Sequence, residues 1–522
     1  MSLRAPAALL GALLTVAMAS TTTRPHAPAT ELGWDEVVWY EVFVRSFQDS
    51  DGDGIGDLRG LVERLPYLSE LGVGGLWLMP TYPSPSYHGY DVTDYEAVNP
   101  EYGTLADMRE LVAQAHARGI RVALDFVPNH TSRRHPWFLA ALAGDERFRA
   151  YYRFEPDPPP IRGTRGGSAW HATPAGDYYL GLFGPGMPDL NLTNPDVTAA
   201  LYAAADFWLE LGVDGFRVDA IQHLIEGDDG QISNTAATYA WVKGFEEHLH
   251  TVAPHAFLVG ETWTEMPAIA RYHRDADLDM SFDYPLWKAV LAALQSRSAA
   301  DLADTLAQER DLYPVGAVRG TFLTNHDQAR HATLLSIPRR DEARLALAAG
   351  LLLTLPGTPF VYYGEELGMP DGPGSGDVEK RTPMRWAPVG ADGSFGFTTG
   401  SPWTEPGSGQ PGVSVAEQAD DPDSLLSRYR RLIAMRNGTD ALRSSDWSVL
   451  RTSARAVLAV ERVGSGETLL VLANLSARPV ALEAGELADY HPSDVITGAD
   501  LESDEGGGLS LPGLSLYVLR AK

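Results

Sequence analysis

The amino-acid sequence predicts a TIM-type (β/α)8 barrel with an inserted subdomain after the third strand and a C-terminal antiparallel β-sandwich. Eight β-like runs alternate with helix-like segments over about 400 residues, which is the order of a parallel barrel. The connection after the third run is far longer than an ordinary loop. A doubly wound open sheet is the alternative, but no G-x-G-x-x-G motif follows the first run, so a dinucleotide-binding fold lacks its signature.

The runs that predict strands are rich in β-branched and aromatic residues or are continuously apolar, as in a buried parallel sheet. They cover 37–44, 72–79, 120–127, 213–219, 256–260, 278–282, 318–324 and 359–363. Helical spacing of apolar residues predicts helices over 104–118, 195–211, 234–252, 286–308, 342–355 and 425–435. Thr104 is the expected N-cap of the first of these helices, and Gly119 is its expected stop.

The long connection after the third strand is rich in Gly, Pro, Tyr and Trp, and we expect it to form an inserted domain over 128–195. We expect the barrel to consist of residues 35–127 and 196–440. Beyond the barrel, the helical pattern gives way to short β-like runs that predict the sandwich over 441–522. These runs cover 449–450, 456–462, 468–475 and 509–519.

Composition excludes several classes of partner. The 522 residues carry a net charge of −28, which argues against nucleic acid and against an anionic membrane. The chain has no cysteine, so disulfides and thiol chemistry are excluded. An acidic surface suits a neutral substrate or a cation, and we expect a monomer.

The N-terminus predicts export. An apolar run over 5–19 follows Arg4 and ends in Ala17-Met18-Ala19, which resembles a signal peptide with its cleavage site after residue 19. We therefore expect a signal peptide over 1–19, a polar, proline-rich linker over 20–34 and a secreted or periplasmic protein. A cytoplasmic N-terminal extension is the alternative. The apolar run is too short to span a bilayer, and no later run is long enough, so no membrane insertion is expected in the mature chain.

Polar and charged residues follow four of the predicted strands at the same end. An arginine and an aspartate two residues apart on a strand point to the same side, where the arginine would hold the carboxylate ionised and lower its pKa. Each residue alone has a structural explanation, as an ion pair or a hydrogen-bonded histidine. Because a barrel carries its chemistry at the carboxyl ends of its strands, the set predicts an active site. Its members are His130, Arg217, Asp219, Glu261, His326 and Asp327.

The segments around these residues resemble the four motifs of the α-amylase family of glycoside hydrolases. They read DFVPNH at 125–130, GFRVDA at 215–220, GETW at 260–263 and TNHD at 324–327. Supporting segments match at 72–80, 88–91, 187–191 and 381–386. The motifs are collinear with those of the family, and the resemblance covers about residues 35–520, nearly the whole mature chain.

The resemblance implies retaining hydrolysis of α-1,4-glucosidic bonds in starch and maltooligosaccharides. Asp219 is then the nucleophile, Glu261 the general acid and later base, and Asp327 orients the sugar hydroxyls. The apolar run before Glu261 and the neighbouring Trp263 should raise the pKa of its carboxyl group. Asp125 is expected to support Arg217. The implied substrate contacts are Tyr90, Asp91, His130, Arg217, His223, His326 and Arg381.

A run of alternating aspartates predicts a calcium site. It begins like an EF-hand loop, but its twelfth position is Gly60 instead of a bidentate Glu. Family members with a similar loop after the first strand bind Ca²⁺ there; the alternative is an acidic Gly-Asp turn. A second calcium near Asn129, as in many amylases of the family, has no other identifiable ligands here. The expected Ca²⁺ ligands are Asp49, Asp51, Asp53, Asp57 and the carbonyl group of Ile55.

Some residues favour an endo-acting enzyme, and others favour an exo-acting one. Ala220, His223 and the export signal favour an endo-acting α-amylase. Gln222 stands where a Lys is usual, and Asp91 and Arg381 resemble a pair that closes the site in exo-acting relatives. The alternatives are therefore an α-glucosidase or oligo-1,6-glucosidase, with transglycosylation open.

The three carboxylates argue against a non-catalytic binding barrel. No predicted strand carries H-x-H and no H-E-x-x-H occurs, which argues against a zinc-dependent hydrolase.

Overall fold

A computed structural model describes residues 32–227, 229–336, 340–390, 394–407, 410–483, 485–498, 500–503 and 508–522. The predicted signal peptide over 1–19 and most of the predicted linker over 20–34 lie outside these residues. The last residues of that linker are described, and they pack on the barrel. Leu32 is buried, and the ring of Trp34 stacks on the ring of Phe257 at 5.4 Å.

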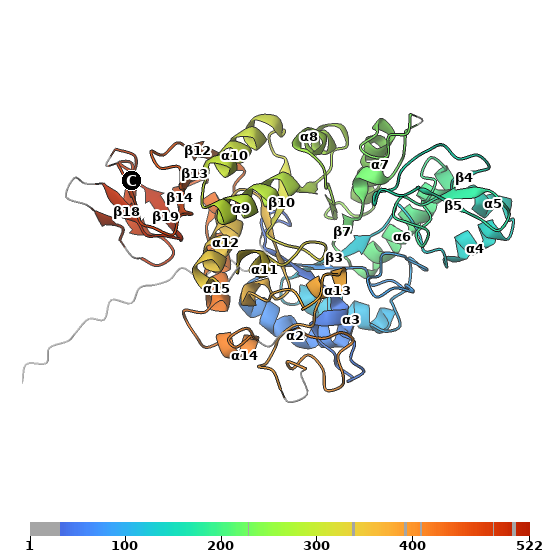
Figure 1. The fold of residues 1–522 in the computed structure, drawn as a ribbon, viewed down its shortest axis with the longest axis horizontal. Helices are drawn as coiled ribbons and strands as arrows, with labels where there is room; N and C mark the ends of the chain where they lie inside the picture. Colours follow the sequence, from blue (N-terminus) through green and yellow to red (C-terminus); the bar gives the residue numbers. More distant parts are fainter. Residues whose placement is uncertain are drawn as a thin grey trace, which may run out of the picture.

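Eight parallel strands close into a barrel in the order β1-β11-β10-β9-β8-β7-β3-β2, which confirms the predicted fold class. The barrel lies between the C-terminal region, drawn in red, and the blue-green region inserted after its third strand (Figure 1). Each strand coincides with one of the predicted runs. The strands are β1 (Trp39–Val42), β2 (Gly75–Leu78), β3 (Arg121–Phe126), β7 (Gly215–Val218), β8 (Phe257–Gly260), β9 (Met280–Phe282), β10 (Val318–Phe322) and β11 (Thr358–Tyr362).

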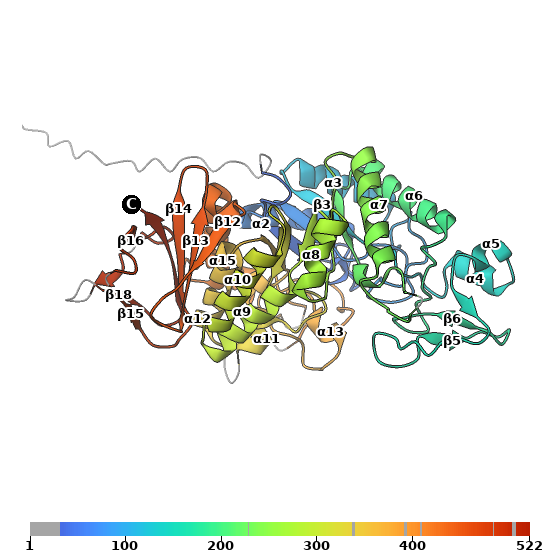
Figure 2. The ribbon, with the colours of Figure 1, turned by 90° about the horizontal axis from the view of Figure 1, so that it is seen from above.

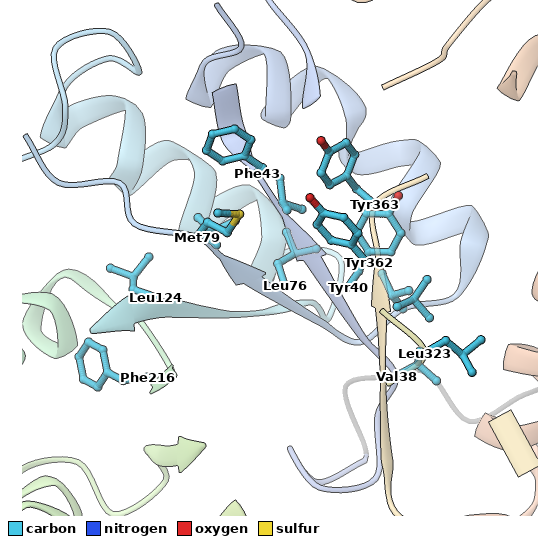
Figure 3. Close-up of a cluster of buried hydrophobic side chains, with 14 of the residues drawn as sticks. Val38, Tyr40, Phe43, Leu76, Met79, Leu124, Phe216, Leu323, Tyr362 and Tyr363 are labelled. Carbon is cyan, nitrogen blue, oxygen red and sulfur yellow. The ribbon is translucent and has the colours of Figure 1, made fainter. Parts of the chain in front are cut away.

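Alternation along the strands separates an inner from an outer apolar core. Outward residues such as Tyr40, Leu76 and Phe216 belong to the large core shared with the helices (Figure 3). Inward residues form an aromatic layer that includes Trp39, Trp77, Phe257, Phe282, Phe322 and Phe360. Two residues further along the strands, inward positions become polar, as at Glu41, Asp125 and Arg217. The aromatic layer fills the barrel toward the amino ends of the strands. The polar layer lies nearer to their carboxyl ends, where the active site is predicted.

Helices surround the barrel, and the prediction of them was incomplete. Helices α2 (Leu58–Leu71) and α8 (Met266–Asp275) were not predicted. The single helix expected over 286–308 was wrong, because it is two helices, α9 (Tyr284–Ser296) and α10 (Ala300–Leu312). Arg297 ends α9 with a left-handed backbone (φ 60°). Thr104 caps α3 as predicted, in a capping box with Asp107. The longer helices are α2 (Leu58–Leu71), α3 (Leu105–His116), α6 (Pro195–Leu211), α7 (Ala236–Val252), α8 (Met266–Asp275), α9 (Tyr284–Ser296), α10 (Ala300–Leu312), α12 (Glu342–Thr354) and α15 (Leu425–Gly438).

Short helices complete the barrel and its loops. They are α1 (Val44–Phe47), α11 (His331–Leu335), α13 (Asp377–Lys380), α14 (Val415–Gln418) and α16 (Asp440–Arg443), with 3₁₀ turns η2 (Ile221–His223) and η3 (Glu365–Leu367). Among the described residues, no helix combines the length and the apolar character that crossing a bilayer requires.

The connection between β3 and α6 carries a small unit of its own. Its three-stranded sheet has the order β4-β6-β5, and its core contains Ile161, Trp170 and Leu180. The elements are α4 (Pro136–Leu142), α5 (Glu146–Arg149), β4 (Phe154–Glu155), β5 (Trp170–Ala172) and β6 (Tyr178–Leu180). This unit and the C-terminal sheets lie at opposite ends of the long axis of the molecule (Figure 2).

The C-terminal region contains two antiparallel sheets, of order β12-β13-β14-β19-β16 and β15-β18-β17. The strand expected over 509–519 is two strands in different sheets, because the chain turns at Pro512-Gly513. Alternate residues of β13 face the second sheet and the barrel core, which fixes the region on the barrel. The strands are β12 (Asp446–Leu450), β13 (Val457–Val463), β14 (Thr468–Asn474), β15 (Val480–Leu482), β16 (Tyr490–Asp494), β17 (Glu502–Ser503), β18 (Leu509–Leu511) and β19 (Ser515–Ala521).

Candidate active site

A pocket of about 510 Å³ opens at the carboxyl ends of the barrel strands. The three carboxylates predicted for catalysis, Asp219, Glu261 and Asp327, all line it. Four of the predicted substrate contacts line it as well: Tyr90, His130, His223 and Arg381. Arg217 and His326 are fully buried behind these residues. The structure therefore gathers most of the predicted site residues at one opening.

One guanidinium group joins three carboxylates. Nη1 of Arg217 donates to Asp125 and to Asp219, each at 2.8 Å. Nη2 of Arg217 lies 3.0 Å from Oε1 of Glu261. Because the arginine side chain is inaccessible to solvent, these ion pairs are not weakened by water. Arg217 therefore fixes Asp219 and Glu261 as neighbours, and Asp125 supports it as expected.

Burial sets the protonation of the two neighbouring carboxyl groups. Arg217 lowers the pKa of Asp219, as expected, but burial outweighs its charge, and the neighbouring charge of Asp125 opposes it as well. Burial raises the pKa of Asp219 to about 6. Burial also raises the pKa of Glu261 to about 7, against the attraction of Arg217 and with the help of the Asp219 charge. Both carboxyl groups therefore hold a proton at a higher pH than free carboxyl groups do, and the charge of Asp219 favours the protonated form of Glu261.

A tight turn after β7 brings the two strand ends together. Ala220 has a left-handed backbone (φ 49°), which is uncommon for a residue other than glycine. Its N–H donates to Oε2 of Glu261 at 2.8 Å. The hydroxyl of Tyr284 reaches Oε1 of the same carboxyl group at 3.5 Å, and the Trp263 ring stacks on Tyr284 at 4.9 Å. Sequence reasoning missed Tyr284, whose only signal was its place just after the weak strand β9.

His326 holds the other side of the site. Its Nδ1 donates to Glu41 at 2.6 Å, and its Nε2 lies 2.7 Å from the hydroxyl of Tyr90 and 3.2 Å from Asp327. Burial alone would lower the pKa of His326, but the charges of Asp327 and Glu41 raise it to about 9. Although burial opposes it, the His326 charge in turn lowers the pKa of Asp327. His326 does not line the pocket, and its two nitrogens contact Glu41, Tyr90 and Asp327, so it orients Tyr90 and Asp327; its predicted contact with substrate stays a prediction.

Two of the histidines that line the pocket, His130 and His223, were predicted to contact substrate. Burial lowers the pKa of His130 to about 3, so its ring is neutral. Nδ1 of His130 accepts a hydrogen bond from Asn129 at 3.2 Å, so its proton is on Nε2, which has no partner in the described part of the chain. His223 uses Nδ1 to bond the carbonyl of Ile232 at 2.7 Å, and its ring faces the pocket. The side chain of Asn129 also donates to Asp189, at 3.3 Å.

Asp91 and Arg381 resemble a pair that closes the site in exo-acting relatives, but they do not pair in this structure. Both residues are described, and no ion pair joins them. Arg381 donates through Nη2 to Asp327 at 3.0 Å, and it lines the pocket. Asp91 lies outside the pocket lining and accepts hydrogen bonds from the hydroxyl groups of Ser84, at 2.7 Å, and Ser86. Asp91 and Arg381 therefore each contact other partners.

The aspartate-rich loop after β1 brings three of its carboxylates together. Asp49, Asp51 and Asp57 each offer an oxygen atom, and these atoms lie within 4.8 Å of one another. This spacing suits oxygen ligands that surround Ca²⁺ at about 2.3–2.6 Å. Asp53 lies outside that group, and its Oδ1 accepts the N–H of Ile55 at 2.8 Å. Three of the four predicted carboxylates therefore converge in this loop, and Asp53 does not join them.

Comparison with known proteins gives a consistent result. Residues 41–445 match the alpha amylase catalytic domain, and residues 447–518 match the maltogenic amylase C-terminal domain. Alpha-amylase 3 of Dictyoglomus thermophilum is 37% identical over 451 residues, which cover 85% of this chain and 85% of that protein. The trehalose synthase/amylase TreS of Mycolicibacterium smegmatis is 34% identical over 89% of this chain and 88% of that protein. The crystal structure of an alpha-amylase from H. orenii is 37% identical, with a TM-score of 0.82 over 94% of this chain and 100% of that chain.

The parallel barrel, with carboxylates converging at its strand ends, and the match to the alpha amylase catalytic domain together indicate a glycoside hydrolase. The chain belongs to the α-amylase family, as its four motifs predicted.

Proposed function

We propose that this protein cleaves α-1,4 bonds of α-glucans and maltooligosaccharides with retention of anomeric configuration, using Asp219 and Glu261. The observation that carries the proposal is that both carboxyl groups face one pocket and share the guanidinium of Arg217. Retaining enzymes need these groups close, about 5–5.5 Å apart, because the nucleophile reaches the sugar directly. Their different pKa values supply an ionised nucleophile and a protonated acid at the same pH.

The reaction then runs in two displacements. The ionised oxygen of Asp219 attacks the anomeric carbon while Glu261 donates its proton to the departing glycosidic oxygen. This forms a glycosyl ester on Asp219. Glu261, now ionised, takes a proton from water, whose oxygen attacks the same carbon and breaks the ester. His130 and Asp327 supply a hydrogen-bond donor and an acceptor that can hold sugar hydroxyls at the pocket.

The two pKa values predict a narrow pH optimum. Activity should fall as the pH drops below about 6, because Asp219 takes up a proton and is no longer a nucleophile. It should also fall as the pH rises above about 7, because Glu261 loses the proton that it donates. A profile of kcat/KM from pH 4 to 9 reports both groups in the free enzyme. A rate that stays constant from pH 7 to 9 would contradict the assignment of Glu261 as the acid.

For the mode of attack, we propose endo cleavage, as in an α-amylase. Ala220 and His223 support it, and the predicted export suits a polymer that cannot cross a membrane. The missing ion pair between Asp91 and Arg381 also supports it, because that pair would close the site beyond one sugar. The second candidate is an exo-acting α-glucosidase or oligo-1,6-glucosidase. The contact of Arg381 with Asp327 favours this second candidate, because the paired side chains restrict the side of the pocket that they line.

The iodine colour of amylose separates the two modes. Endo attack should bleach the colour while few reducing ends have formed, because each cut shortens a long helix. Exo attack should release many reducing ends, mostly as glucose, while the colour persists, and this result would favour the second candidate. Product analysis with maltotriose, isomaltose and trehalose tests the bond type and glucosyl transfer in parallel. Neither result bears on Asp219 as the nucleophile.

We further propose that the loop of Asp49, Asp51 and Asp57 binds Ca²⁺, with the carbonyl of Ile55 and Asp53 as the other predicted ligands. Bound there, the cation would neutralise three converging carboxylates and stabilise the folded state by mass action. Asp49 also folds the loop directly, because it accepts three backbone N–H bonds from it.

Removal of Ca²⁺ should lower the melting temperature by about 3–6 °C, and it should change the rate at low temperature much less. Melting temperatures in EDTA and in excess Ca²⁺ measure the effect. Asp51→Asn should abolish the difference, while Asp94→Asn, at an exposed aspartate outside the loop, should retain it. Equal shifts in wild type and Asp51→Asn would exclude this loop as the site.

A further inference from the structure

A second cluster of metal-ligating side chains lies at the opposite end of the barrel. Glu246 and His250 are one turn apart on α7, and Asp279 directly precedes β9. Each offers one atom, and these atoms lie within 4.8 Å of one another. α7 leads into β8, whose far end carries Glu261, and Asp279 stands at the entry of its strand. The cluster is therefore at the amino ends of the strands, away from the pocket.

The distances within this cluster match a tetrahedral metal site. Nε2 of His250 lies 3.3 Å from Oε2 of Glu246 and 3.0 Å from Oδ2 of Asp279. Ligands bound at about 2.0–2.2 Å in tetrahedral geometry stand roughly 3.4 Å apart. Small side-chain shifts suffice to place an ion between the three atoms. The histidine side chain is 41% exposed, which leaves a solvent-facing side for entry and for a water ligand.

Burial and backbone contacts position both carboxylates. The side chain of Glu246 is only 4% exposed, and its buried Oε2 lies 3.3 Å from Nε2 of His250. Its other oxygen accepts the backbone N–H of Asp279 at 2.8 Å, which directs Oε2 toward His250. Oδ2 of Asp279 accepts the N–H of Leu258, in β8, at 3.0 Å. These two backbone hydrogen bonds hold both carboxylates in place.

We propose that Glu246, His250 and Asp279 form a binding site for a divalent transition metal, with Zn²⁺ as the best fit. One imidazole nitrogen and two carboxylate oxygens are ligands that Zn²⁺, Co²⁺ and Ni²⁺ accept. Ca²⁺ prefers six to eight oxygens and fits poorly. Because the ligands come from α7 and from the start of β9, the bound ion clamps the helix to the lower rim of the barrel. The site takes no part in the proposed hydrolysis.

The same three residues also have a metal-free interpretation. A protonated His250 can bridge the two carboxylates, and its hydrogen bond to Glu246 raises the pKa of His250 to about 9. A metal ion must displace that proton, so the test is best made near pH 8. The two interpretations differ in one measurable respect, which is whether an added metal binds at these residues.

The experiment uses the full chain, stripped with EDTA and returned to saturating Ca²⁺, so that the aspartate-rich loop is filled. Zn²⁺ at about 100-fold excess over its Kd should raise the melting temperature by about 2–4 °C. His250→Gln should abolish the increase. His248→Gln is the matched control, because this histidine on the same helix has a single carboxylate partner, Asp206, at 2.8 Å. The control should respond to Zn²⁺ like the wild type.

Co²⁺ supplies a second readout that does not depend on stability. Tetrahedral Co²⁺ absorbs visible light strongly, and the band should appear at one equivalent in wild type and His248→Gln but not in His250→Gln or Asp279→Asn. If Zn²⁺ leaves the wild-type melting temperature unchanged, or shifts wild type and His250→Gln equally, the proposal is wrong. The cluster would then be a proton-bridged ion pair.

Discussion

Replacing Asp219 by Asn should lower kcat on a maltooligosaccharide by at least about 10³-fold, while the protein stays folded. An amide oxygen is a far weaker nucleophile than a carboxylate, and the described pocket offers no second carboxylate in the same position. The amide can still accept the hydrogen bond that Arg217 gives to Asp219 at 2.8 Å. The variant therefore separates loss of the nucleophile from collapse of the ion-pair network. Kinetics and a thermal melt of the same sample measure both.

The matched control for this variant is Asp94→Asn, which changes an exposed aspartate outside the pocket in the same way. It should keep wild-type kcat and melting temperature. If Asp219→Asn retained a tenth of the wild-type kcat, the nucleophile would have to be another group. If it lost its cooperative melt, the result would report on folding and not on catalysis.

The barrel was predictable because its strands follow local rules. Period-two alternation and continuous apolar runs identified all eight strands, and the collinear motifs placed polar residues at their carboxyl ends. One error, the single helix expected over 286–308, arose where the sequence gives no signal of a break. Nothing in the stretch around Arg297 marks a break, since the sequence has neither glycine nor proline there, yet its left-handed conformation separates α9 from α10. In contrast, Pro512-Gly513 did signal a turn within the expected strand over 509–519.

The composition of the site was predictable, but the pairing of its side chains was not. Arg217 and Asp219 are two residues apart, so their contact follows from strand geometry. Glu41 and His326 are 285 positions apart, and only the closed barrel brings them within 2.6 Å. This contact orients the ring of His326, which also contacts Tyr90. The net rise in the pKa of Asp219 was not predictable for a related reason, because the burial that causes it depends on the packed fold.

Asp91 shows that a motif resemblance does not predict the partners of a side chain. Its resemblance to a pairing residue of exo-acting relatives rested on one position, while its actual partners, Ser84 and Ser86, come from the adjacent loop. Short polar side chains next to a carboxylate compete for it, and motif matching does not weigh that competition. Resemblance at single positions therefore did not predict which side chains Asp91 and Arg381 contact.

Replacing Glu261 by Gln should lower kcat/KM on a maltooligosaccharide by about 10²–10⁴-fold, the usual contribution of a general acid and base. The amide can still accept the N–H of Ala220, so the turn after β7 should persist. The alkaline limb of the pH profile near pH 7 should disappear, because the group that titrates there is gone. Glu265→Gln, at an exposed glutamate four residues further on, is the matched control and should keep the wild-type profile.

The role of Glu261 can be distinguished from that of any other essential residue by the leaving group. An aryl α-glycoside with an acidic phenol departs without a proton, so its first displacement should be nearly as fast in Glu261→Gln as in wild type. Hydrolysis of the glycosyl ester on Asp219 still needs the base that activates water. The variant should therefore release one equivalent of phenol in a burst and then turn over slowly. An equal loss of rate on both substrates, without a burst, would show that Glu261 is neither the acid nor the base. The proton donor would then have to be sought elsewhere in the pocket.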